Sequence, residues 1–171
     1  MNRPIFFSCC LAAALALPAF AHEPGAHVHG VGKLQVVLDS NTLTLSLDSP
    51  LANLVGFEHV PQNEQQKAAV RAMADKLNQA AVLFAPTPAA QCQVASVRLA
   101  APVLAPASKR DGHADLDADF VFRCLQPAAL RDIEVRLFAA FPQLQRLDVE
   151  IVGPRGQTAA RLTPKQPRVT W

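Results

Sequence analysis

The chain has 171 residues, half of them hydrophobic, and a formal net charge of +2. This length favours one domain, and the near-neutral charge excludes functions driven by bulk electrostatic attraction to nucleic acid or to a membrane surface. With 7 glycines and no tyrosine, the chain also has little material for a glycine-rich nucleotide loop or an aromatic-lined pocket.

The first 21 residues are typical of a secretory signal peptide. Arg3 supplies a positive charge, residues 5–17 are almost wholly apolar, and Ala19-Phe20-Ala21 has the small-x-small form of a cleavage site. The apolar run is too short to span a bilayer, so we expect no membrane insertion after cleavage. Cleavage after Ala21 would leave residues 22–171, and we expect these 150 residues to form a single domain.

Three of the five histidines follow this cleavage site, at His22, His27 and His29. His27 and His29 are two residues apart, and in an extended chain that spacing points both imidazoles to the same side. Neutral imidazole is the commonest side-chain ligand of zinc and copper ions. The cluster therefore predicts metal binding. His22, whose α-amine would be free after cleavage, could chelate copper instead.

The next elements are a hairpin, a loop and a helix. Apolar residues alternate over 34–38 and 43–47 around a turn at 39–41, which predicts a β-hairpin. A short loop follows and carries the polar pair Glu58-His59 among apolar residues. Asn63 is placed to cap a helix, with Gln66 as its return partner, and apolar residues then recur at helical spacing as far as Phe84.

Two strands with one cysteine each come next. Residues 92–100 and 116–124 read as an antiparallel pair, and placing Cys92 opposite Cys124 puts Val94 opposite Phe122 and Ser96 opposite Phe120. This register keeps apolar positions together. The two cysteines are therefore predicted to form one disulfide, as expected of an exported chain.

A second helix is predicted from Pro127, because Leu130, Ile133, Leu137 and Phe141 recur at spacings of three and four. Ile133, Val135 and Leu137 also alternate, so a strand is an open alternative. Strands at 147–151 and 158–162 close the chain. The predicted fold is α+β, a mostly antiparallel sheet in ββ-α-ββ-α-ββ order with two helices and one disulfide.

Three further residues are candidate metal ligands. His59 could complete a site with the N-terminal pair, or hydrogen-bond the loop backbone. His113 and Asp115 are two apart at the predicted hairpin tip, where imidazole with carboxylate suits zinc, although a solvated tip explains them equally well. No pattern for nucleophilic or paired-carboxylate catalysis stands out, so an enzyme is not expected.

Together these residues resemble the ZrgA-like family of exported zinc-uptake proteins of Gram-negative bacteria. The resemblance rests on His27-Val-His29-Gly30, Gly56-Phe57-Glu58-His59, the two cysteines and His113-Ala-Asp115, and it spans nearly the whole mature chain. It implies a periplasmic protein that binds zinc and works beside a zinc ABC importer or its binding protein. Family members often carry a long His/Asp-rich insertion between the cysteine-bearing strands, whereas residues 101–115 here hold one histidine and two aspartates.

The sequence thus predicts a zinc-binding protein that assists zinc uptake. The expected ligands are drawn from His27, His29, His59, His113 and Asp115. One alternative is copper binding through the amino terminus at His22. Another is a metal-free periplasmic interaction module.

Overall fold

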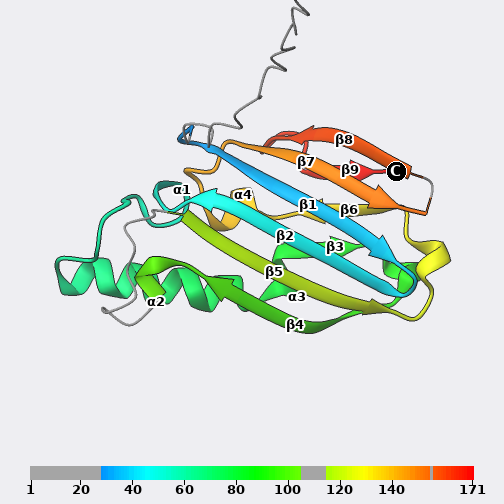
Figure 1. The fold of residues 1–171 in the computed structure, drawn as a ribbon, viewed down its shortest axis with the longest axis horizontal. Helices are drawn as coiled ribbons and strands as arrows, with labels where there is room; N and C mark the ends of the chain where they lie inside the picture. The colour runs from blue at the N-terminus through cyan, green and yellow to red at the C-terminus, as the bar shows by residue number, and fades with distance from the viewer. Residues whose placement is uncertain (1–27, 105–114, 155) are drawn as a thin grey trace, which may run out of the picture.

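The computed structural model describes residues 28–104, 115–154 and 156–171. These residues form nine strands in two sheets, with short helices between them (Figure 1). The predicted α+β fold with one mostly antiparallel sheet is therefore wrong. The protein is β-rich, and its larger sheet is mixed.

The larger sheet has six strands in the order β4-β5-β2-β1-β7-β8. Their bounds are β1 (Val31–Asp39), β2 (Thr42–Pro50), β4 (Cys92–Ala100), β5 (Asp115–Cys124), β7 (Arg146–Gly153) and β8 (Gly156–Leu162). Neighbouring strands are antiparallel except β1 and β7, which pair in parallel. That parallel pair joins segments more than a hundred residues apart, and nothing in the local sequence pattern predicts it.

The smaller sheet is antiparallel and has the order β3-β6-β9. Its strands are β3 (Phe84–Pro86), β6 (Asp132–Val135) and β9 (Arg168–Thr170). The α-helices among the described residues are α1 (Ala52–Val55), α2 (Glu64–Leu77), α3 (Ala80–Leu83) and α4 (Leu137–Ala140).

The core lies between the two layers. Figure 1 shows α2, α3 and the smaller sheet on one face of the larger sheet. Leu45 and Phe120 from the larger sheet and Met73 from α2 are at most 2% exposed. The rings of Phe84 and Phe120 meet across the layers, with their centroids 4.8 Å apart. No element of the described residues covers the opposite face of the larger sheet, where charged side chains meet solvent.

Two predicted features of the first half are confirmed. The hairpin β1–β2 turns at Ser40 and Asn41, with its apolar residues buried on one face. Helix α2 begins after Asn63, whose side chain accepts the Gln66 N–H at 2.9 Å, and the Gln66 side chain in return accepts the N–H of Gln62 at 2.7 Å. The predicted continuation to Phe84 is divided, because α2 ends at Leu77, α3 is a separate turn and Phe84 begins a strand.

The predicted helix from Pro127 is wrong. A 3-10 turn at Pro127–Ala129 is followed by strand β6, and only Leu137–Ala140 are α-helical. Ile133 and Val135 are fully buried between flanking strands, and Asp132 and Glu134 on the other face bond Arg168 of β9. The strand alternative is the correct one, because β3 and β9 supply hydrogen-bond partners on both edges of β6.

The predicted disulfide is present between Cys92 and Cys124. The pairing of Val94 with Phe122 is also confirmed. Beyond that point the register shifts by one residue at a β-bulge, so Ser96 faces Val121 and not Phe120. The expected signal peptide lies outside the described residues, and none of the described helices is long and apolar enough to cross a membrane.

Candidate metal site at the N-terminal end of β1

Several predicted site residues belong to segments that meet at one end of the larger sheet. Strand β1 starts there, and β2 ends there because the two strands are antiparallel. Strand β5 also starts there, since Asp115 pairs with Pro50. Helix α1 follows β2 directly and leads into the loop at 56–59. The topology thus brings His29, this loop and Asp115 to the same end of the sheet.

His29 lies on a tight turn rather than on an extended strand. The Val31 N–H donates to the Val28 carbonyl at 3.0 Å, and Gly30 has a φ of 82°, which favours glycine. The Gly30 carbonyl accepts the N–H groups of Gln145 and Arg146 at 2.7 and 2.9 Å. His29 itself is therefore not in an extended strand, whereas His27 lies outside the described residues and its direction relative to His29 stays untested.

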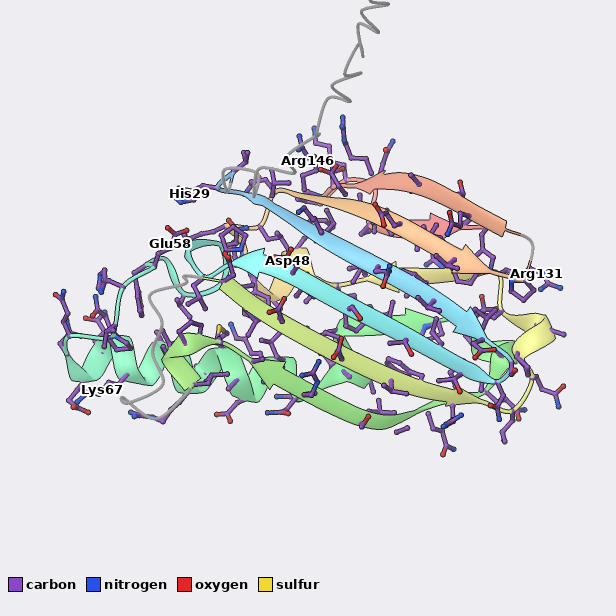
Figure 2. All side chains as sticks on the ribbon, in the orientation of Figure 1. His29, Asp48, Glu58, Lys67, Arg131 and Arg146 are labelled. Atoms are coloured by element: carbon purple, nitrogen blue, oxygen red, sulfur yellow. A yellow bond between two sulfur atoms is a disulfide. The ribbon has the colours of Figure 1, made fainter. Side chains whose placement is uncertain are left out.

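The partner of His29 is Glu58. The His29 Nε2 atom lies 3.0 Å from Glu58 Oε1, and the side chains are 70% and 35% exposed (Figure 2). A carboxylate oxygen can only accept here, so Nε2 donates a proton in this contact, and zinc would have to displace that proton to bind Nε2. Two ligand atoms on a tetrahedral zinc ion, each about 2.0–2.1 Å from the metal, are about 3.3 Å apart. The two groups are therefore close to the separation at which both could bind one ion.

Gly56 directs the loop that carries Glu58. It ends α1 in the left-handed conformation, with φ of 86°, and its N–H donates to the Ala52 carbonyl at 3.1 Å. A Cβ at this position would lie 3.2 Å from Gln143 Nε2. The loop therefore leaves α1 in a direction that a residue with a side chain would adopt only with strain.

His59 is next to Glu58 but has its own contacts. Its ring stacks on Phe57 with centroids 5.1 Å apart, and its Nδ1 lies 2.9 Å from the Val60 carbonyl. Because a carbonyl oxygen only accepts, Nδ1 carries the proton and Nε2 keeps the lone pair. Metal-binding histidines usually donate their second N–H in this way. The predicted backbone contact is present, and it leaves His59 able to bind a metal.

The described residues do not complete a metal site. No group of three or more His, Cys, Asp or Glu side chains among them is arranged to hold a metal ion. Asp115 is half-buried at the first position of β5, while His27 and His113 lie outside the described residues. The set His27, His29, His59, His113 and Asp115 therefore stays a prediction.

Sequence reasoning missed two residues near this site. Glu58 was noticed as part of a polar pair, but His59 was preferred as the ligand. Asn53 was not singled out, although an amide in the apolar run 51–55 must find partners if it is buried. A search for polar residues inside apolar loops would have found both.

A groove of about 690 Å³ lies on the open face of the larger sheet. Its lining includes Lys33, Asp48, Asp117, Asp119, Asp148 and Arg161, and it contains no histidine. Burial and the neighbouring Asp48 and Asp119 raise the pKa of Asp117, whereas a hydrogen bond from Ser46, aided by Arg98, lowers the pKa of Asp119. Asp48, Asp119 and Asp148 already pair with cations. The groove is therefore a poorer zinc site than the pair His29 and Glu58.

A family model described as "ZrgA family zinc uptake protein" matches residues 26–171. The chain belongs to this family. The match includes both cysteines and every predicted ligand, and it links the chain to zinc and to a transport-associated role. Nothing supports the copper alternative, whose main residue, His22, lies before the matched region. No curated protein gives a significant match to the chain.

Proposed function

We propose that this chain is a periplasmic zinc-binding protein that holds Zn²⁺ at the start of β1 and assists its uptake. The observation that carries the proposal is the contact between His29 Nε2 and Glu58 Oε1 in a member of a zinc uptake family. Zinc prefers imidazole nitrogen and carboxylate oxygen ligands, and this contact already places one of each at nearly the required separation.

The ligand set is His29 and Glu58, joined by His27 and by the Nε2 atom of His59. Tetrahedral zinc takes four ligands, or three and a water molecule. Asp115 begins β5 at the same end of the sheet, and His113 precedes it by two residues in the sequence; these two are the candidates for an additional or replacement ligand. Since His29 and Glu58 are largely open to solvent, an ion bound there could be passed on.

The role is binding and transfer rather than catalysis. An exchangeable ligand position suits delivery to a zinc ABC importer or its binding protein. The disulfide supports a periplasmic location, because such bonds persist in oxidising compartments. The expected signal peptide at 1–21 would supply the export step.

Calorimetric titration of zinc into the chelator-stripped protein starting at His22 tests the proposal. We expect tight binding that is lost when His27→Ala and His29→Ala are combined. The matched control is His22→Ala, which should bind as the unmodified protein does, because His22 belongs only to the copper alternative. Absence of zinc binding, or a double variant with unchanged affinity, would contradict the proposal.

The same titration should depend on pH. Imidazole binds zinc only when neutral, so protons compete with the metal and the affinity should weaken below about pH 6. An affinity that stays the same between pH 7.5 and 5.5 would argue against histidine ligands.

A further inference from the structure

Asn53 connects the two chain segments that carry His29 and Glu58. It lies in α1 and is only 2% exposed. Its Oδ1 accepts the Gly30 N–H at 2.6 Å, and its Nδ2 donates to the Val31 carbonyl at 2.9 Å and to Ser49 Oγ at 3.1 Å. The side chain therefore uses its acceptor and both of its donors.

These bonds join neighbours of both site residues. Gly30 directly follows His29, so the bond to its N–H holds the turn on which His29 lies. Glu58 comes five residues after Asn53, beyond the cap at Gly56, so α1 and its loop are held by the same amide. Ser49 is buried near the end of β2, so its hydrogen bond with Asn53 joins α1 to the larger sheet.

The arrangement matters because His29 and Glu58 are themselves exposed. Exposed side chains have many rotamers, so their separation depends on how well the two backbones are fixed. The amide of Asn53 links these backbones directly, and a buried side chain with all its bonds satisfied has little freedom. A site whose supports are loose loses affinity even when every ligand is present.

We infer that Asn53 is a positioning residue of the zinc site, which sets the His29 turn against the Glu58 loop without touching the ion. The inference rests on the proposed function. It predicts that removing the Asn53 amide weakens zinc binding although no ligand residue is replaced.

The test compares the unmodified protein with Asn53→Ala and with Val169→Ala. Val169 is 1% exposed in β9 of the smaller sheet, so its truncation destabilises the fold through another element. We expect zinc affinity to fall about tenfold in Asn53→Ala. In Val169→Ala it should stay within about a factor of two, as expected for distant sites.

A second readout needs no metal. Hydrogen exchange of the Gly30 amide, measured by NMR, should become faster in Asn53→Ala and stay unchanged in Val169→Ala. If Asn53→Ala does not fold, Asn53→Asp serves in the affinity measurement, because it removes the donors to Val31 and Ser49 while keeping nearly the same shape and the acceptor of the Gly30 N–H. Zinc affinity should fall in that variant as well.

The outcomes separate the inference from the proposed function. If the unmodified protein does not bind zinc, the proposed function fails and the inference fails with it. If it binds zinc and Asn53→Ala binds equally well, only the inference is overturned. Equal weakening in both variants would also overturn it, since that result reflects lost stability rather than lost positioning.

Discussion

At the residue scale, the central feature is a contact between two exposed side chains that lie 29 positions apart. The polar pair Glu58-His59 in an apolar loop left two interpretations open, a hydrogen bond to the loop backbone or a metal ligand at His59. The histidine was preferred because imidazole is the commoner ligand. In the structure Glu58 contacts His29, whereas His59 donates to its own neighbour, Val60.

Replacing Glu58 by Gln tests this contact. Gln keeps the size of the side chain but removes the negative charge, so we expect zinc affinity to fall at least about tenfold. Folding stability should change by less than about 0.5 kcal/mol, because Glu58 is exposed and lies outside the core. Calorimetry and denaturant unfolding measure the two effects.

The matched control is Glu64→Gln, the same change at another exposed position. Glu64 begins α2 and pairs with Lys67 at 2.8 Å, and its pKa is lowered mainly by that hydrogen bond. Zinc affinity should not change there. Equal losses in the two variants would mean that zinc responds to total charge and that Glu58 is no ligand.

At the element scale, local sequence patterns correctly predicted the features that depend on residues close together in the sequence. The hairpin β1–β2 follows from the alternation of apolar and polar residues around a polar turn, and α2 begins directly after its capping residue, Asn63. The region after Pro127 fitted both a helix and a strand, since Ile133 and Leu137 satisfy either period. Hydrogen bonding to β3 and β9 settled the choice, and no local pattern encodes it.

The disulfide between β4 and β5 should contribute measurably to folding stability. Cys92 and Cys124 face each other across β4 and β5 and are 32 residues apart in sequence. Replacing both by Ala should lower the free energy of unfolding by about 3–4 kcal/mol, because the cross-link restricts the unfolded chain. Urea unfolding with and without a reductant measures this.

The reductant supplies the control for that measurement. It should destabilise the unmodified protein and leave the double Ala variant unchanged. A variant as stable as the oxidised protein would show that the cross-link contributes little to stability.

At the scale of the whole molecule, helices α2 and α3 and the smaller sheet cover one face of the larger sheet and leave the other face to solvent. Asp48 and Asp117 stand directly opposite each other on that open face. Like charges in this position are unfavourable. Burial first, and then repulsion by Asp48 and Asp119, raise the pKa of Asp117.

Asp117→Asn should therefore stabilise the protein at pH 7. The folded-state pKa lies above the ordinary value of 3.8, so stability falls as the pH rises through the interval between the two values. Removing the charge should recover a few tenths of a kcal/mol above that interval, a small effect because Asp117 is exposed. Below the ordinary pKa the gain should vanish.

Asp119→Asn is the mirror-image control. The pKa of Asp119 is lowered by Ser46 and Arg98, so its charge stabilises the fold above the ordinary pKa, and this contribution is lost as the pH falls through the folded-state value. This variant should be less stable at pH 7, and the difference from the unmodified protein should shrink as the pH falls below the ordinary value of 3.8. Urea unfolding at pH 7 and pH 3 measures both variants, and a shift of the same sign in the two would contradict the assignment.

The sequence by itself determined the local features and the family. Alternation, capping residues and the cysteine positions specified the first hairpin, the start of α2 and the disulfide, because each depends on a short spacing or on one register. The motifs from His27 to Cys124 were sufficient to predict the family of zinc uptake proteins, which the family match confirms.

Only the tertiary structure decided how distant segments meet. The parallel pairing of β1 with β7, the second sheet around β6 and the bulge after Val94 all depend on partners far along the chain. The same holds for the contact of His29 with Glu58 and for the bonds of Asn53. Such contacts join residues that are distant in the sequence and close only in the folded chain. The local residue pattern around either partner therefore does not identify the other.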